Sequence, residues 1–280
     1  NAAGRIEAAD VALDLLLTDD FARAAVLARQ LEDANRERQQ IERRLLESAI
    51  HTVERDGLAE HAAALVLSGA DWHLGVIGIV ATRLVARYGR PIAIISIQPG
   101  GPARGSVRGI EGVDVTAALR ECSPLLVRYG GHSQAAGLEL DPKLVPKFAA
   151  AFDHAVRQQI GGGRPQRSLH VDSAIGLGDI TEELLDWIER LEPYGYGFPP
   201  PMWAAFDVEV TDWRIVQTAH VRMELRQGSH RMQAIAFRQA DRPRPGGTVD
   251  VAFELKRNSG PRDQAADLVL SDWRERAVRT

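Results

Sequence analysis

Gly130-Gly131-His132 is the segment whose residue types point most directly to chemistry. Two glycines let the backbone turn tightly and leave its N–H groups bare, and a helix beginning after them would direct its positive dipole end at an anion. The imidazole of His132 can donate a hydrogen bond to a phosphate oxygen or to a metal-bound water. Glycine-rich loops are common, so a phosphate site and an ordinary tight turn with a satisfied histidine are both open at this point.

Arg104, Ser106 and Arg108 alternate along the chain, and a β-strand would place all three on one face. Two guanidiniums flanking a hydroxyl suit a phosphate clamp. Successive members would lie about 6.6 Å apart, so a phosphate fits best between Ser106 and Arg108, with Arg104 further out. The competing interpretation is a solvated strand edge whose charges discourage aggregation.

The segment from Trp72 to Gly78 combines one histidine with two glycines. Gly75 and Gly78 predict tight packing of a helix on a sheet, and His73 is the polar residue at the predicted strand-to-helix corner. No group of Asp, His and Glu has the spacing of a metal site, and no nucleophile elbow is present. The residues therefore predict phosphate binding, with no metal ligands in this segment.

The elements that must position these residues follow from the hydrophobic periodicity. Positions 6–53 are almost free of Gly and Pro, and apolar residues recur as on one face of a long helix: Leu27, Leu31, Ala34, Ile41 and Leu45. Strand and helix patterns then alternate, which predicts an α/β layer fold. Strands are expected at 62–67, 91–97 and 137–140, and helices at 77–88, 115–120 and 144–159.

The glycine-rich run at 161–167 predicts a linker between two domains. Beyond it the hydrophobic period changes to two, as in the strand where Val221, Met223 and Leu225 alternate with charged residues. Five strands are expected, at 206–213, 220–226, 231–237, 249–255 and 267–273, with one helical segment at 180–191. This pattern fits a small closed barrel such as an OB-fold.

Composition limits the classes of protein that fit. The chain has 280 residues, of which 45% are hydrophobic and 26% charged, as expected for about two globular domains. No apolar run reaches the roughly 20 residues of a membrane helix, and no secretory leader is recognisable. The single cysteine, Cys122, cannot form an internal disulfide, which fits a reducing cytoplasm. Because the chain starts at Asn1, within a motif and not at Met, we expect it to be a fragment.

The net charge of −4 is unevenly distributed. Residues 1–200 carry 21 basic and 27 acidic side chains, whereas residues 201–280 carry 13 and 11, which gives net charges of −6 and +2. Nearly all basic side chains are Arg, which suits bidentate phosphate contacts. The C-terminal region is therefore the better candidate for a nucleic-acid contact.

Several motifs occur together in one order along the chain: Asn1 to Arg5, Trp72 to Ile79, Arg104 to Gly109, Tyr129 to Gly137 and Leu191 to Pro201. In this combination the sequence resembles the RecJ branch of the DHH phosphoesterase superfamily over essentially its whole length. The resemblance implies a connector helix region at 1–55, a DHH-associated α/β domain with the Gly-Gly-His loop at 56–160, and an OB-fold that binds single-stranded DNA at 168–280.

The resemblance also implies an activity and its requirements. Such enzymes degrade single-stranded DNA from its 5′ end, in recombination and repair, with two Mn²⁺ or Mg²⁺ ions held by an N-terminal DHH domain. That domain's ligands are missing here, so this segment alone is expected to be inactive. The implied partners are single-stranded DNA, the DHH domain of the same protein, a single-strand binding protein and a RecQ-like helicase, and the implied location is the bacterial cytoplasm at the nucleoid.

Residue roles carry over from the same resemblance. Arg5, Ser106 and Arg108 would hold the terminal phosphate, His132 would contact the scissile phosphate, and Asn1 would orient Arg5 or a phosphate. Arg104, Gly130 and Gly131 would complete the phosphate site. The family pattern is departed from at Leu74, where an acidic residue is frequent, and at Val107, where a small residue is common. In the barrel the expected DNA contacts are Arg222, Arg226, Lys256 and Arg257, with the last two in a turn.

Two other functions share parts of this pattern. A phosphoesterase for cyclic dinucleotides or very short oligonucleotides would share the Gly-Gly-His domain, but a short substrate needs no appended barrel. A non-catalytic module that binds single-stranded DNA would share the barrel, in which Arg contacts and stacking aromatic residues grip a strand with little sequence preference.

Overall fold

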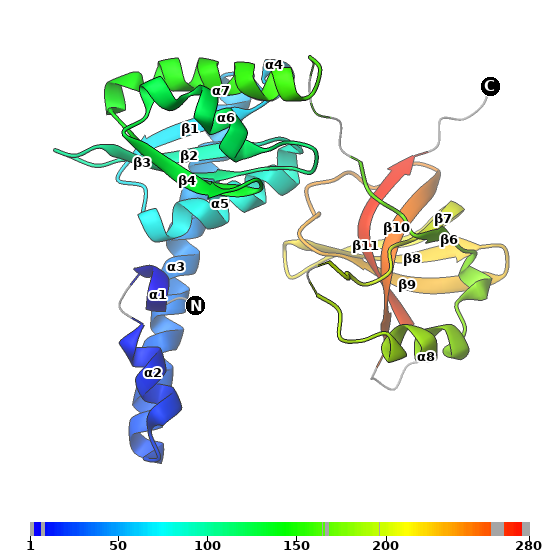
Figure 1. Ribbon diagram of the computed structural model, residues 1–280. Helices are drawn as coiled ribbons and strands as arrows, with labels where there is room; N and C mark the ends of the chain where they lie inside the picture. The colour runs from blue at the N-terminus through cyan, green and yellow to red at the C-terminus, as the bar shows by residue number, and fades with distance from the viewer. Residues whose placement is uncertain are drawn as a thin grey trace. The chain divides into compact units, whose positions relative to one another are not determined.

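The computed structural model describes residues 3–6, 9–163, 165, 168–195, 197–258 and 266–275 (Figure 1). The chain divides into two compact units, Asn1–Arg167 and Ser168–Thr280. Among the described residues, no helix combines the length and the apolar character that crossing a bilayer requires. The fold class expected from the sequence, a mixed α/β domain followed by a small β-barrel, is confirmed.

The first unit contains a five-stranded mixed sheet. Its strands, in spatial order, are β1 (Leu65–Ala70), β2 (Ile92–Ile97), β3 (Ala103–Arg108), β5 (Ala135–Leu140) and β4 (Arg128–His132). β1 and β2 are parallel, joined by the helix α5 (Leu74–Tyr88), and the other pairs are antiparallel. A parallel pair needs such a helical crossover, whereas the antiparallel β4–β5 pair needs only a short turn.

Helices cover both faces of this sheet (Figure 1). Ile92 and Ile94 of β2 pack with α5 and with the end of the long helix α3, while Ala93 and Ile95 pack on the opposite side. That opposite side is covered by α6 (Val115–Glu121) and α7 (Val145–Gln159). Burial on both faces explains why β2 is an uninterrupted apolar run.

The predicted long helix is real but begins later than expected. The chain forms α1 (Ala3–Ile6), α2 (Asp10–Leu17), α3 (Phe21–Arg55) and α4 (Leu58–His61), and α2 lies beside the first half of α3 (Figure 1). Thr18 is extended, and the Asp20 carboxylate caps α3 by accepting hydrogen bonds from the N–H groups of Ala22 and Arg23. Because Asp favours this capping geometry over a helix interior, the helix is interrupted there although Gly and Pro are absent.

The second unit is a closed five-stranded barrel. Its order is β7 (Trp203–Val216), β8 (His220–Gln227), β9 (His230–Ala236), β11 (Ala266–Glu275) and β10 (Thr248–Arg257), and β10 pairs with β7 to close it. β9 and β11 are parallel, and the other barrel pairs are antiparallel. Val221, Met223 and Leu225 lie in the core, as their spacing predicts. This is the OB-type barrel expected from the sequence.

Shorter elements complete the two units. They are the 3₁₀ turns η1 (Ser123–Leu125), η2 (Pro142–Leu144) and η3 (Leu177–Asp179), the short strand β6 (Ser173–Ala174), and the helix α8 (Glu182–Arg190). β6 adds to the barrel beside the start of β7.

One buried carboxylate joins α3 to α5. Glu42 is only 1% exposed and forms ion pairs with Arg38 of its own helix and Arg83 of α5. Burying a charge is costly unless it is paired, so these contacts fix the helices relative to each other.

Replacing Glu42 with Ala is expected to lower the free energy of unfolding by about 3 kcal/mol, because two partly buried guanidiniums lose this carboxylate. Urea unfolding measures the change. Glu47→Ala is the control, since Glu47 is exposed on the same helix and its loss should change stability by less than about 0.5 kcal/mol. Equal effects of the two substitutions would contradict a structural role for Glu42.

Candidate nucleic-acid site

Three neighbouring strands bring the predicted phosphate-binding residues onto one face of the sheet. In antiparallel strands, residues that lie directly opposite each other share a face. Across β3, β5 and β4 the register gives three rows: Arg104 with Glu139 and Arg128, Ser106 with Gly137 and Gly130, and Arg108 with Ala135 and His132. The sheet therefore brings Ser106, Arg108 and His132 together, as the sequence predicts, with Arg104 one row further out.

The middle row is bare of side chains beyond Ser106. A Cβ on Gly130 would meet no atom within 4 Å, and one on Gly137 would meet only the carbonyl oxygen of Gly105, at 3.8 Å. We call this open stretch, formed by Gly130 and Gly137, the glycine floor. A ligand can approach the backbone there, with Ser106 at one side and the two flanking rows at either end.

The Gly-Gly-His segment itself differs from the expected turn followed by a helix. It forms the end of the edge strand β4, and Ser133 and Gln134 make a short hairpin turn into β5. No helix dipole therefore points from its end at an anion. Gly131 has a φ of 151°, and a Cβ there would lie 2.4 Å from the carbonyl oxygen of Ala135, so this glycine is required by the backbone alone.

The beginning of α5 lies against the row of Arg108 and Ser106. A Cβ on Gly78 would lie 2.8 Å from Nη2 of Arg108 and 3.1 Å from Oγ of Ser106. Nη1 of Arg108 donates to Oγ of Ser106 at 2.9 Å and to the carbonyl oxygen of Val107 at 2.8 Å. The close packing predicted at Gly78 is thus a contact with the proposed phosphate clamp.

Arg5 reaches the same place from α1. A Cβ on Gly75 would lie 1.9 Å from the carbonyl oxygen of Arg5, and Nη1 of Arg5 donates to the carbonyl oxygen of Gly75 at 3.3 Å. Gly75 therefore admits α1, a contact that the sequence did not predict. His73 is the N-cap of α5, because its Nδ1 accepts a hydrogen bond from the N–H of Gly75 at 3.1 Å. Asn1 lies outside the described residues.

Among the described residues, no acidic side chain forms an ion pair with the positive charges at this place. Burial, and then the nearby charge of Arg5, lower the pKa of Arg108 below its ordinary value. Neither Arg5 nor Arg108 forms an ion pair with a carboxylate of any described residue. Two close, uncompensated guanidiniums beside a hydroxyl favour an anion such as phosphate.

In the outer row, formed by Arg104, Glu139 and Arg128, the basic side chains are paired with a carboxylate. Oε1 of Glu139 accepts from Nη2 of Arg128 at 2.7 Å and lies 2.8 Å from Nε of Arg104. The hydrogen bond from Arg128 holds the pKa of Glu139 below its ordinary value. No role is predicted for Arg128 or Glu139 from the sequence. The alternation of Arg128 with Gly130 is a usable signal, but the meeting of Arg128 with Arg104 depends on the strand register.

His132 is exposed at the end of β4, and its side chain forms no hydrogen bond to another residue in the described part of the chain. It lies in the row of Arg108, two strands away, which is about 10 Å across the sheet. Within the described ranges, no group of three or more His, Cys, Asp or Glu side chains is placed to hold a metal ion.

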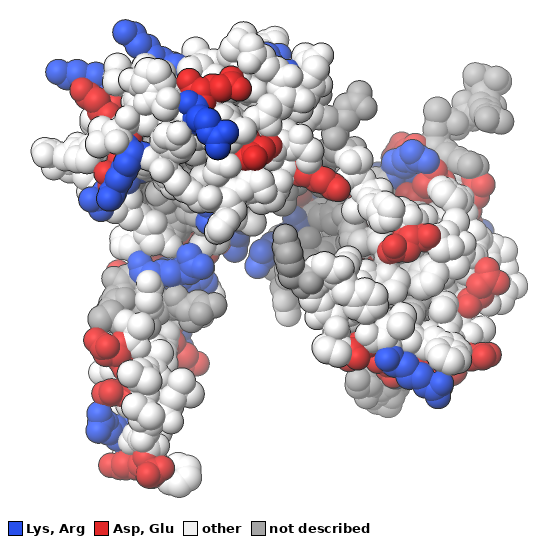
Figure 2. Space-filling model, viewed as in Figure 1, with Lys and Arg blue, Asp and Glu red and all other residues white. Residues whose placement is uncertain are grey.

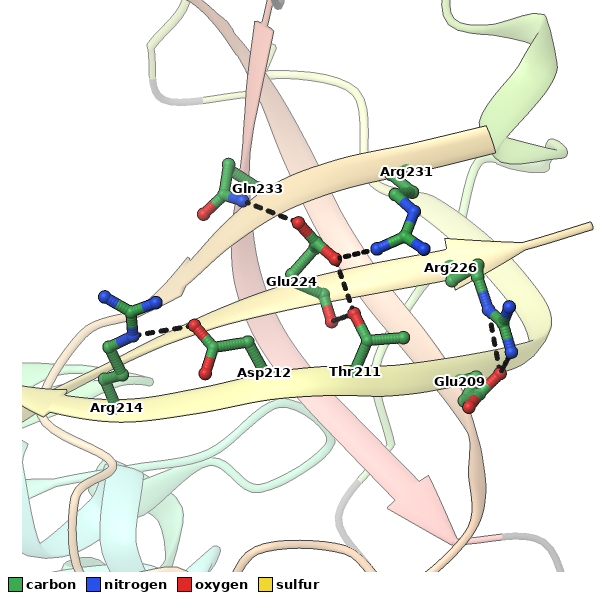
Figure 3. Close-up of polar contacts among 8 residues, drawn as sticks. All are labelled: Glu209, Thr211, Asp212, Arg214, Glu224, Arg226, Arg231 and Gln233. Atoms are coloured by element: carbon green, nitrogen blue, oxygen red, sulfur yellow. Dashed lines mark hydrogen bonds and ion pairs between the residues drawn. The ribbon is translucent and has the colours of Figure 1, made fainter. Parts of the chain in front are cut away.

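Two of the four barrel residues expected to contact DNA, Arg226 and Arg257, form ion pairs with carboxylates. On the outer face of β7, β8 and β9, Arg226 donates to Glu209 at 2.9 Å, and neighbouring pairs join Arg231 to Glu224 and Arg214 to Asp212, both at 2.7 Å (Figure 3). Glu224 also accepts from Thr211, and these two contacts lower its pKa. In the space-filling view, acidic and basic side chains are interspersed over the barrel (Figure 2).

Arg257 is the most strongly engaged of these residues. It contacts three carboxylates of α8, with distances of 2.7 Å to Glu189 and 2.6 Å to Asp186 and a further contact to Glu182. The hydrogen bond that Arg257 donates to Glu189 is the largest cause that raises the pKa of Arg257. Arg257 and the exposed Lys256 end the strand β10 and are not in a turn, because the β10–β11 pairing extends to them.

Of these four residues, Arg222 and the exposed Lys256 form no ion pair with a described carboxylate. Arg222 is half-buried on β8, opposite Arg214 and Ile235. The rings of His220 and Phe237 meet edge to face near this end of β8, with centroids 5.2 Å apart, and Phe237 is 50% exposed. This aromatic pair was not predicted, since the two residues are brought together only by strand pairing.

The fold comprises an α/β domain, which carries the candidate anion site, and an OB barrel. Two family models match the chain in this order: the DHHA1 domain over residues 61–158 and the RecJ OB domain over residues 171–272. The chain belongs to the RecJ family, and it corresponds to the C-terminal portion of such proteins.

Relatives and solved structures agree with this assignment. The chain is 31% identical to the single-stranded-DNA-specific exonuclease RecJ of Bacillus subtilis, with 98% of the chain and 36% of the relative covered. It is also 31% identical to RecJ of Thermus thermophilus, covering 98% and 39%. The crystal structures of the latter with Mg²⁺ and with Mn²⁺ match 99% of the chain, covering 42% and 40% of the relative, with 30% identity and TM-scores of 0.75 and 0.78. The chain thus spans less than half of these relatives.

The two glycines of β4 are expected to respond differently to the same substitution. Gly131→Ala should lower the free energy of unfolding by about 2 kcal/mol, since its Cβ would collide with the backbone of Ala135. Gly130→Ala should leave stability nearly unchanged but weaken the binding of single-stranded DNA, because its methyl group fills the glycine floor. Urea unfolding and fluorescence anisotropy measure the two effects. Unchanged DNA binding by Gly130→Ala would exclude the glycine floor from the site.

Proposed function

We propose that the chain is the part of a single-strand-specific DNA exonuclease that binds the 5′ end of the strand. The observation that carries the proposal is the pair of guanidiniums of Arg5 and Arg108, which lie near each other without an ion pair among the described residues. Arg108 also bonds Ser106 beside the glycine floor. The names of the RecJ relatives support the nuclease activity. Degradation in the 5′-to-3′ direction, and a place in recombination and repair in the bacterial cytoplasm, belong to the same proposal.

The proposed roles follow from the positions of the residues. Arg108, Ser106 and Arg5 bind the terminal phosphate, which carries more charge than an internal diester and so gains more from guanidinium contacts. His132, across the bare floor, donates to a non-bridging oxygen of the scissile phosphate and stabilises charge that develops there. Gly130 and Gly131 keep the backbone open and correctly turned, and Asn1 stays a proposed contact outside the described residues.

Hydrolysis itself is proposed to require a DHH domain elsewhere in the protein. Structures of relatives contain Mg²⁺ or Mn²⁺, but the described residues form no group that could hold such an ion. We therefore assign the two ions to the rest of the protein and expect the chain alone to be inactive with either metal. A single-strand binding protein and a RecQ-like helicase are further proposed partners.

The barrel is proposed to bind the strand downstream, at the end of β8 that carries Arg222. Arg222 can contact a phosphate without breaking an ion pair. Arg226 and Arg257 must first break their ion pairs with Glu209 and Glu189. Phe237, half exposed beside His220, offers a ring on which a base can stack. An extended grip of this kind favours a long strand over the cyclic or very short substrates of other DHH phosphoesterases.

The proposal is tested by the preference for a phosphorylated end. The chain should bind 5′-phosphorylated single-stranded DNA more tightly than the 5′-hydroxyl form, and Arg108→Gln should reduce that ratio by about 10-fold, since one charge-assisted contact is lost. Fluorescence anisotropy with the two oligonucleotides measures the ratio. Arg120→Gln, an exposed charge on α6, is the control and should leave it unchanged. An equal loss for both oligonucleotides would deny Arg108 a role in recognising the end.

In the barrel, Arg222→Gln is expected to reduce the salt dependence of DNA binding more than Arg226→Gln. Each lost phosphate contact lowers the slope of log K against log salt by about 0.7 on single strands. The slope should fall by about this amount for Arg222 and by much less for Arg226, whose charge is already shared with Glu209. Anisotropy titrations at several salt concentrations give the slopes. The reverse order would show that the Arg226–Glu209 pair opens for DNA and that Arg222 is not the main contact.

A further inference from the structure

We propose that Arg104 and Arg128, held by Glu139, form a second phosphate-binding position on the glycine floor, which takes a phosphate of the strand other than the terminal one. The inference rests on the proposed function, because it concerns the same DNA strand. It assigns binding to Arg128 and a positioning role to Glu139, and it moves Arg104 from the terminal phosphate to the second position.

Charge at the outer row favours an anion. One oxygen of Glu139 serves both guanidiniums, so the row has an excess of one positive charge. The two Arg side chains are 52% and 71% exposed, and their contacts with Glu139 use Nε of Arg104 and Nη2 of Arg128. A guanidinium has five N–H donors, so several on each side chain face solvent. An anion can bind there without breaking either contact with Glu139.

Glu139 fixes the two guanidiniums in place. Its residue is 8% exposed, and its pKa is lowered by the hydrogen bond from Arg128, so the carboxylate stays ionised. Arg104 approaches it from β3 and Arg128 from the edge strand β4, on either side of β5. Both cations are therefore held over the same strip of backbone, which costs less binding entropy than ordering two mobile side chains.

The spacing of the rows argues for a ligand with more than one negative group. The row of Arg104 lies two residues from Ser106 along β3, about 6.8 Å, and Arg108 lies the same distance on the other side. Between these cationic ends, Gly130 and Gly137 leave the backbone uncovered. Positive charge at both ends of an open floor fits a linear polyanion, which a DNA strand is, better than an isolated phosphate.

A structural role alone is the competing explanation. The pair between Arg128 and Glu139 joins the edge strand to β5, as cross-strand ion pairs commonly do. That role needs only one guanidinium, and it predicts that substitutions change the stability of the hairpin and not the dependence of binding on ligand length. The two explanations therefore differ in a measurable way.

The test compares thymidine 5′-monophosphate with the 5′-phosphorylated trinucleotide of thymidine, using calorimetry on the whole chain. Arg128→Gln and Arg104→Gln are each expected to weaken binding of the trinucleotide by about 5-fold, while binding of the mononucleotide changes less than about 2-fold. Arg29→Gln removes an equal charge from an exposed position of α3 and serves as the control for net charge. It should change neither ligand's affinity appreciably.

Each outcome of these binding measurements supports or overturns the second phosphate-binding position. Unchanged trinucleotide binding in both Arg variants, or an equal loss for both ligands, overturns the second position. If Arg128→Gln disrupts the edge strand, mononucleotide binding falls too, and Arg104→Gln on the interior strand β3 then decides the question. Failure of the proposed function is distinguishable, because the unmodified chain would then bind neither ligand or show no preference for a 5′ phosphate.

Discussion

The antiparallel register of β3, β5 and β4 is the constraint on which the site depends. A shift of one residue would turn Gly137 and Gly130 toward the face covered by α6 and α7 and bring Leu138 and Tyr129 to the opposite face. Such a shift is opposed by the core, because Leu138 and Leu140 are buried with α6 and α7. The apolar face of the sheet therefore determines which polar residues meet on the other face.

Close approach of backbone to side chain is the second requirement of this site. Gly78 lets α5 lie against Arg108 and Ser106, and Gly75 admits the backbone of Arg5. Burial, and then repulsion from the nearby charge of Arg5, lower the pKa of Arg108. A bound phosphate would offset the repulsion between Arg5 and Arg108, so the ligand-free site already favours binding of an anion.

In the barrel, several exposed basic side chains form ion pairs with neighbouring carboxylates. The barrel's outer face carries Arg226, Arg231 and Arg214, each beside a carboxylate (Figure 3). Surface pairs of this kind contribute little to stability, but they reduce the charge available to a phosphate. A grip on DNA is therefore expected to be confined to places such as Arg222 with Phe237.

The sequence alone determined the order of the elements and the class of chemistry. Period-two and helical patterns located the barrel strands, α5 and α7 to within a few residues, since burial leaves its period in the chain. The alternation of Arg104, Ser106 and Arg108 placed them correctly on one face. Only the tertiary structure decided that Gly-Gly-His ends an edge strand, that Arg128 meets Arg104 at Glu139, and that Arg257 is enclosed by α8. These depend on which strands pair and in which register, and such contacts between residues distant in the chain leave no local pattern.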